Sequence, residues 1–132
     1  SVNIMMAQRL VSKICQNCKK SETLPTGIAE AVKKELDLIP AEFRPKEKEL
    51  LIWRAPGCSA CKERGIAGRV AIFEVLTMTS ELKNLISAKT DAQMILQESK
   101  RQGMVTMRQD GILKALKGLV SMEEVLRETA EF

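Results

Sequence analysis

The sequence has no histidine and few aromatic residues. The lack of histidine excludes several types of catalytic and metal site. Without histidine, no Ser–His or Cys–His nucleophile pair can form, and no imidazole is available as a metal ligand. None of the seven glycines is followed by lysine, so the chain holds no phosphate-binding P-loop of the Walker A type. The acidic residues are scattered and indicate no acid–base couple. We therefore do not expect this chain alone to turn over a nucleotide.

Long apolar runs and targeting segments are lacking as well. No stretch approaches the roughly 20 apolar residues that a membrane-spanning helix needs, and the N-terminus does not resemble a signal peptide. With 45% hydrophobic and 29% charged residues, the 132-residue chain is expected to be globular, with one or two small cores. Its apolar start, without an initiator methionine or a helix cap, leads us to expect a piece cut from a longer protein.

The four cysteines form two C-x-x-C pairs, Cys15 with Cys18 and Cys58 with Cys61. Each such turn can direct two thiolates at one tetrahedral ion, which is the ligand pattern of structural zinc. Four sulfur ligands leave no open coordination position, so the predicted Zn²⁺ would hold structure and would not activate water. The 39 residues between the pairs would then form an insertion that the metal closes at its base.

The residues alone leave other states of the cysteines open, namely disulfides, an iron site, a redox pair and free thiols. Two disulfides require an oxidising compartment, which the lack of a signal peptide argues against. Iron suits a cage of four thiolates, but such sites usually carry aromatic shielding, and aromatic residues make up only 3% of this chain. A thioredoxin-type redox pair would explain one C-x-x-C motif and not two, and free thiols are the remaining alternative.

Hydrophobic periodicity predicts an α+β chain that is mostly helical. The expected helices cover residues 5–14, a stretch containing Ile28, Val32 and Leu36 that ends near Pro40, and four segments that begin near Thr79 or Ser80, Asp91, Thr106 and Ser121. The expected strands cover residues 50–53 and 69–76, and a charged loop is expected at 45–49. The last four helices have short links and capping residues, which favours a compact C-terminal helical bundle.

Several stretches carry a specific set of motifs. They are Ala-Gln-Arg-Leu-Val at 7–11 before the first cysteine pair, Pro-Gly-Cys-Ser-Ala-Cys at 56–61, the glycine and strand motifs at 65–69 and 72–76, and the helical segments at 103–111 and 117–127. In this order, over nearly the whole chain, the set resembles the C-terminal part of the secretion ATPases of the type II secretion and type IV pilus assembly superfamily.

The resemblance implies a division of the chain. Residues 1–14 would be the terminal helix of a RecA-like core, 15–65 a tetracysteine zinc-binding insertion, 66–78 a core strand, and 79–132 a C-terminal helical subdomain. The sheet would be a short remnant of that core. The Walker A and Walker B motifs would lie upstream, so ATP and Mg²⁺ would bind only the full-length parent. This chain itself would not be an enzyme.

The resemblance also implies a function. The chain would be the non-catalytic C-terminal fragment of a hexameric motor ATPase, with the zinc site supporting hexamer assembly and docking to inner-membrane platform proteins. Its partners would be the rest of the parent ATPase and the neighbouring subunits. The protein would be cytoplasmic, held at the inner membrane through these partners. Arg69 matches a family arginine near the nucleotide or the subunit contact; alternatively, it is a solvated arginine at the start of a strand.

The residues alone also allow a second function. It is a zinc-ribbon module that binds nucleic acid, followed by a helical oligomerisation domain. Lys19, Lys20, Lys62 and Arg64 lie beside the cysteine pairs, as this alternative requires. However, the formal net charge is only +4, and no Lys/Arg cluster is interleaved with aromatic residues. We therefore expect most charges to form a solvated surface and do not expect nucleic acid as a partner.

Overall fold

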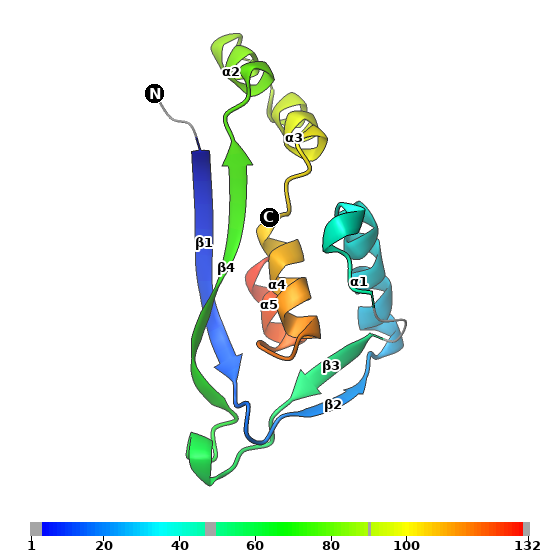
Figure 1. Cartoon of the computed structure of the whole chain (residues 1–132), viewed down its shortest axis with the longest axis vertical. Coiled ribbons are helices and arrows are strands. Elements are labelled where there is room, and N and C mark those ends of the chain that lie inside the picture. The colour runs from blue at the N-terminus through cyan, green and yellow to red at the C-terminus, as the bar shows by residue number, and fades with distance from the viewer. Residues whose placement is uncertain (1–3, 47–49, 90, 131–132) are drawn as a thin grey trace.

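The computed structural model describes residues 4–46, 50–89 and 91–130 (Figure 1). Its elements, in chain order, are β1 (Ile4–Ile14), β2 (Lys20–Thr23), α1 (Thr26–Leu38), the 3₁₀ turn η1 (Ala41–Phe43), β3 (Leu51–Arg54), the 3₁₀ turn η2 (Ser59–Cys61), β4 (Ile66–Thr77), α2 (Ser80–Ser87), α3 (Ala92–Arg101), α4 (Met107–Leu116) and α5 (Met122–Glu128). Within these residues the fold is α+β, as predicted, with five α-helices and two small two-stranded sheets.

The helix predicted over residues 5–14 is wrong, because this segment is the strand β1. It pairs antiparallel with β4, from Ile4 opposite Thr77 to Ile14 opposite Ile66. A helix would have buried Leu10 beside Val11, but in the strand Val11 is buried and Leu10 is exposed. The apolar positions fit a period of two as well as a helical period, and pairing with a strand more than fifty residues away decides between them.

The β1–β4 ribbon has one buried and one exposed face, because successive side chains of a strand point to opposite sides. Val11 and Ile72 belong to the inner face and are part of the hydrophobic core that α4 and α5 also form. The outer face carries the exposed apolar side chains of Ile4, Met6, Leu10, Phe73 and Val75. The ribbon is therefore not amphipathic, because apolar side chains occupy its exposed face as well as its buried face.

Helix α4 is the centre of the core and packs against α5, α1, β3 and both strands of the ribbon. It begins with the predicted capping box, in which Thr106 accepts from the Gln109 backbone N–H and Gln109 accepts from that of Thr106. Gly111 allows the close approach of α5, because a Cβ built there would lie 2.6 Å from Val125 Cγ1. Figure 1 shows α4 and α5 between the ribbon and α1.

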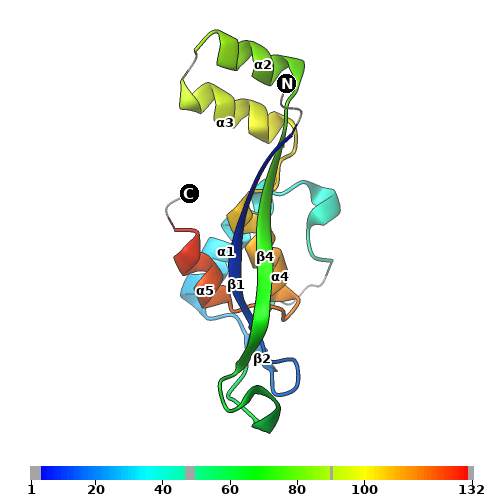
Figure 2. The same cartoon turned by 90° about the vertical axis from the view of Figure 1, so that its left-hand side faces the viewer.

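The four C-terminal helices begin near the predicted caps, but they do not form one compact bundle. Helices α2 and α3 pack together at one end of the ribbon, whereas α4 and α5 lie along its middle (Figures 1 and 2). The contact between α2 and α3 includes a buried polar residue, Glu98, which is 6% exposed and accepts a hydrogen bond from the Thr79 hydroxyl at the start of α2. Ile86 and Leu96, which a bundle would bury, are 44% and 48% exposed.

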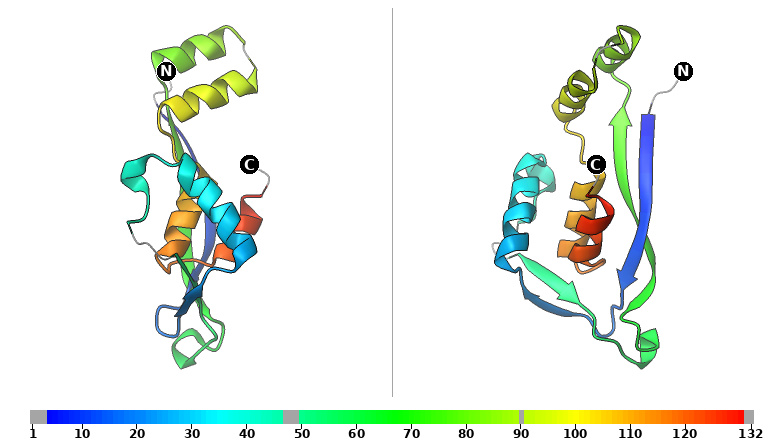
Figure 3. Two further views of the ribbon diagram at one scale, coloured as in Figure 1. Left: turned by 90° about the vertical axis from the view of Figure 1, so that its right-hand side faces the viewer. Right: turned by 180° about the vertical axis from the view of Figure 1, so that it is seen from behind.

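The segment between the two cysteine pairs folds as a second hairpin with a helix. Strands β2 and β3 pair antiparallel, from Lys20 opposite Arg54 to Thr23 opposite Leu51. The predicted helix and strand are confirmed as α1 and β3, whereas β2 was not predicted. Figure 3 shows α1 across α4 from the ribbon. Of the predicted charged loop, residues 47–49 lie outside the described residues. None of the helices described here has the length and apolar character needed to span a bilayer.

Candidate metal centre

The two C-x-x-C turns meet between the β1–β4 ribbon and the β2–β3 hairpin, at the end of the molecule opposite α2 and α3 (Figure 1). Cys15 directly follows β1, and Cys18 lies two residues before β2. Cys58 caps the start of the turn η2 and Cys61 is its last residue, and η2 precedes β4. The first cysteine pair lies in the link between β1 and β2, and the second lies in the link between β3 and β4. The pairing of β1 with β4 and of β2 with β3 therefore brings the two cysteine pairs together.

The four sulfur atoms lie within 4.8 Å of one another. Sγ of Cys58 is 3.8 Å from Sγ of Cys15 and 3.8 Å from Sγ of Cys61. Four sulfurs at the tetrahedral zinc distance of about 2.3 Å would be separated by about 3.8 Å, so the spacing fits such an ion. None of the four cysteines is in a disulfide, for which the sulfurs would have to lie about 2.05 Å apart. The cluster could hold a metal such as zinc.

Several N–H groups point at the sulfurs. The Asn17 side-chain amide donates to Cys58 Sγ at 3.3 Å, and the backbone N–H groups of Cys58 and Gly65 donate to Cys61 Sγ at 3.2 Å. The amide of Asn17, followed by a backbone N–H, lowers the pKa of Cys58 to about 6. Burial opposes ionisation of Cys61, but backbone N–H groups outweigh it and its pKa is lowered as well. These donors favour thiolates, the form that binds a metal.

Cys18 differs from the other members of the cluster. Desolvation raises its pKa to about 12, and hydrogen bonds with the other sulfurs act in the same direction, against a backbone N–H of Gly57. A thiol surrounded by sulfurs loses its proton readily only when a positive charge lies at their centre. The donor set therefore fits a divalent cation, which supplies that charge and which coordinates deprotonated thiols.

Glycines shape the turn that carries Cys58 and Cys61. Gly65 has a positive φ of 74°, and a Cβ built on it would lie 2.4 Å from the carbonyl oxygen of Ala55. Its carbonyl oxygen accepts from the backbone N–H of Cys15 at 2.9 Å. Gly65 therefore ties the second turn directly to the first cysteine, and any larger residue at this position would clash with the backbone of Ala55.

The cluster is also tied to the C-terminal end of α4, which the sequence did not indicate. The side-chain amide of Gln16 donates to the carbonyl oxygen of Gly118 at 3.0 Å, and Lys19 Nζ donates to the same oxygen at 3.2 Å. Lys19 Nζ also lies 4.7 Å from the centroid of the Trp53 ring. Both hydrogen bonds come from side chains next to the cysteines. The end of α4 is therefore positioned by the first C-x-x-C turn.

The other candidate, Arg69, is not part of the cluster. It lies on β4 opposite Ser12, with an exposed side chain on the outer face of the ribbon. Arg9, on the inner face, donates to the backbone carbonyl oxygen of Glu128, the last residue of α5. The structure thus brings the four predicted ligands together and leaves Arg69 on the exposed face of the ribbon.

Comparison with known proteins gives consistent matches along almost the whole chain. A family described as type II/IV secretion system protein matches residues 1–127. The type IV pilus assembly ATPase PilB of Pseudomonas aeruginosa is 33% identical over 99% of the chain, that of Myxococcus xanthus 37% over 98%, and the type II secretion system ATPase E of Vibrio cholerae 35% over 96%. These matches cover 22%, 22% and 23% of the relatives, so the chain spans about a fifth of their length.

Proposed function

The chain belongs to the type II/IV secretion system protein family, and from this we propose that it works as the non-catalytic C-terminal part of a secretion or pilus-assembly motor ATPase. The relatives named above are ATPases, and the chain corresponds to about a fifth of each. Its own sequence has no glycine followed by lysine and hence no Walker A motif. ATP and Mg²⁺ would bind the remaining part of the parent protein.

We propose that the tetracysteine cluster binds one structural Zn²⁺. The observation that carries this proposal is the separation of 3.8 Å between neighbouring sulfurs, together with the N–H groups that favour thiolates. Cys15, Cys18, Cys58 and Cys61 would hold the ion. Because all four positions are filled by sulfur, the ion would close the insertion at its base and would offer no position for water.

The ribbon supports a further part of the proposal, that residues 1–14 and 66–78 belong to a larger RecA-like core. Met6, Leu10, Phe73 and Val75 form an apolar outer face, and exposed apolar patches usually mark contact surfaces. In this proposal the insertion covers residues 15–65 and the helical subdomain residues 79–132. The outer face would then pack on the rest of the parent ATPase, with Arg69 as a contact to the nucleotide or to a neighbouring subunit.

We further propose that the insertion and the terminal helices support a hexameric assembly in the cytoplasm and dock onto an inner-membrane platform protein. The family membership supports this role. The alternative of a nucleic-acid-binding module has less support, because Lys19 is held by Gln16, by Gly118 and over the ring of Trp53. A lysine held in this way is a poor phosphate ligand.

Native mass spectrometry under non-reducing conditions, with a thiol count on the same sample, tests the metal site. One zinc with four unoxidised thiols is the expected result. A metal-free protein lighter by four protons would mean two disulfides and would contradict the zinc site and the cytoplasmic location. Docking is tested by co-purification of the platform protein with the full-length ATPase and with its Cys58→Ser variant, from which we expect reduced recovery of the platform protein.

A further inference from the structure

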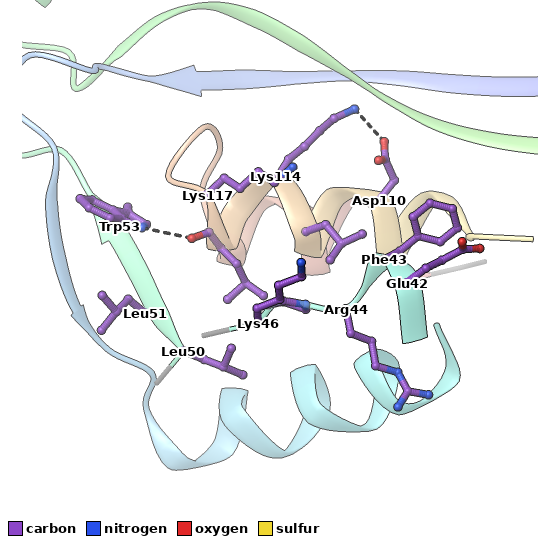
Figure 4. A pocket seen from close by; sticks show the side chains of 13 residues that line it. Glu42, Phe43, Arg44, Lys46, Leu50, Leu51, Trp53, Asp110, Lys114 and Lys117 are labelled. Atoms are coloured by element: carbon purple, nitrogen blue, oxygen red, sulfur yellow. Dashed lines mark hydrogen bonds and ion pairs between the residues drawn. The ribbon is translucent and has the colours of Figure 1, made fainter. Parts of the chain in front are cut away.

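The C-terminal end of α4 receives hydrogen bonds from both ends of the cysteine-bounded insertion. Next to the first C-x-x-C turn, Gln16 Nε2 and Lys19 Nζ donate to the carbonyl oxygen of Gly118 at 3.0 Å and 3.2 Å. On β3, which leads to the second turn, the ring N–H of Trp53 donates to the carbonyl oxygen of Leu116 at 3.4 Å, drawn as a dashed line in Figure 4. We call Gln16, Lys19 and Trp53 the capping group of α4.

Gly118 needs these donors because it is buried at the point where the helix ends. Its φ is +80°, its N–H donates to the carbonyl oxygen of Ala115, and the N–H of Leu119 donates to that of Lys114, which is the Schellman pattern of a helix end. The carbonyl oxygen of Gly118 has no partner within this pattern, and a buried carbonyl without a donor is costly. The positive charge of Lys19 also suits the negative end of the helix dipole.

The capping group is closely packed as well as hydrogen-bonded. Lys19 Nζ donates to Gln16 Oε1 at 2.8 Å and lies 4.7 Å from the centroid of the Trp53 ring. A Cβ built on Gly118 would lie 2.8 Å from Lys19 Nζ and 3.1 Å from two ring atoms of Trp53. The three side chains and the glycine therefore form one contact network, in which a displacement of one member disturbs the others.

A metal at the cysteines would fix one side of this network. Gln16 lies between Cys15 and Cys18, and Lys19 directly follows Cys18. An ion bound by both cysteines would therefore determine the path of the chain through Gln16 and up to Lys19. The nearby backbone bond from the Ile14 N–H to the carbonyl oxygen of Leu119, at 3.0 Å, starts instead from the last residue of β1 and needs no metal.

We propose that the capping group couples the metal centre to the C-terminal end of α4. In this role Gln16, Lys19 and Trp53 are positioning residues for the bound metal, whereas the four cysteines are its ligands. The inference rests on the structural Zn²⁺ proposed above. Because coupling between two sites is reciprocal, contacts that zinc strengthens must in turn strengthen the binding of zinc. Loss of a member of the capping group should therefore loosen the end of α4 and also release zinc faster.

Hydrogen exchange and zinc release test the coupling in the zinc-loaded chain. The amide N–H groups of Gly118 and Leu119 report opening of the end of α4, and transfer of zinc to an excess of a chromophoric chelator at pH 7 reports release. For Gln16→Ala and Lys19→Met, each shown by native mass spectrometry to carry one zinc, we expect both rates to rise about tenfold, the lower end of the range for lost outer-shell partners. Lys20→Met, an exposed change of the same kind on β2, should leave both rates unchanged.

Trp53→Phe separates the coupling from a direct effect of charge on the thiolates. It keeps an aromatic ring, changes no charge and removes the N–H that donates to Leu116. We expect both rates to rise, by less than in Lys19→Met, because a hydrogen bond of 3.4 Å is weak. Gly111→Ala is the control for a general loss of stability, since its added Cβ would meet Val125 and not the capping group. Its zinc release should stay at the wild-type rate.

The outcomes separate the coupling from the metal site. A chain that binds no zinc overturns both. Zinc bound by four thiols, with wild-type rates in Lys19→Met and Trp53→Phe, overturns the coupling and leaves the metal site standing. Faster release in Lys19→Met alone would be a direct effect of its charge and would also overturn the coupling. The same holds if release from Gly111→Ala is as fast as release from Trp53→Phe, because general destabilisation would then explain both.

Discussion

The Sγ atoms of Cys15 and Cys58 lie 3.8 Å apart, although 43 positions separate the two residues in sequence. This contact joins the end of the β1–β4 ribbon to the loop that follows the β2–β3 hairpin. A single ion at this point would fix the relative position of both hairpins.

Removing one ligand should cost most of the stability of the chain. For Cys15→Ser we expect loss of bound zinc and a broad, non-cooperative thermal transition, because structural zinc supplies about 10–16 kcal/mol, comparable with the whole stability of a domain. Wild-type protein treated with a chelator should behave in the same way. Calorimetry with metal analysis makes the measurement. Ser59→Ala, at an exposed position between Cys58 and Cys61, is the matched control. An unchanged melting curve for Cys15→Ser would show that the site is dispensable.

Asn17 should tune the affinity of the centre without contributing a ligand. Its amide donates to Cys58 Sγ at 3.3 Å and so stabilises the thiolate. For Asn17→Ala we expect zinc affinity to fall about 10–100-fold, the range found for lost outer-shell partners. Competition with a chromophoric chelator at pH 7 measures it. Lys20→Ala, an exposed change just beyond the same turn, is the control. Equal affinity of both variants and the wild type would mean that this hydrogen bond has no role in metal binding.

Local signals predicted many of the elements in this molecule. Thr79, Asp91, Thr106 and Ser121 each accept a hydrogen bond from a backbone N–H of the helix that follows. The last three were predicted as helix starts, and for the first helix the sequence left Thr79 and Ser80 as alternatives. The C-x-x-C spacing likewise predicted the cysteine cluster. Such features depend on residues three or four positions apart, so the sequence displays them directly.

Features that depend on distant partners were missed. The segment Ile4–Ile14 is a strand because β4 supplies its pairing groups, and its apolar pattern alone did not distinguish strand from helix. The buried position of Glu98, which bonds to Thr79 at the start of α2, was also not predicted, because a glutamate usually lies on the surface. Contacts such as Gln16 to Gly118 link positions about a hundred residues apart and leave no local signal.

Packing around Gly111 should be intolerant of even one methyl group. A Cβ at this position would lie 2.6 Å from Val125 Cγ1, so we expect Gly111→Ala to lower the free energy of unfolding by about 1–3 kcal/mol. The control is Gly27→Ala in α1, where no atom lies within 4 Å of the added Cβ; this change should be neutral or stabilising by up to about 1 kcal/mol. Urea unfolding of both variants gives the comparison. An equal change in the free energy of unfolding for both variants would contradict this prediction, because it would mean that α4 and α5 can move apart without loss of stability.

Glu98 should make the α2–α3 pair sensitive to acid. Hydrogen bonds from Arg101, and then from Thr79, outweigh burial and lower its pKa from 4.5 to about 2. Because the pKa is lower in the folded state, the carboxylate stabilises the fold above about pH 4.5, and this contribution is lost as the pH falls toward 2. Glu98→Gln should therefore melt below the wild type at pH 7, with a difference that shrinks under acid. Metal release affects both proteins and cancels in the difference. A constant difference between pH 7 and pH 3 would contradict this role.

Arg69 should matter for the motor and not for the fold. Its side chain is exposed on the outer face of the ribbon, beside the apolar patch proposed to contact the rest of the parent ATPase. A surface arginine contributes little to stability, so Arg69→Ala in the full-length protein should leave thermal unfolding unchanged. If Arg69 contacts the nucleotide or a neighbouring subunit, ATP turnover per assembled particle should fall at least about tenfold, equivalent to about 1.4 kcal/mol. Arg64→Ala, an exposed change in the turn before β4, should retain full turnover. Wild-type turnover in a folded, assembled Arg69→Ala protein would contradict both roles and would mean that Arg69 is only a solvated residue near the start of a strand. Loss of assembly at an unchanged melting temperature would assign Arg69 to the subunit contact.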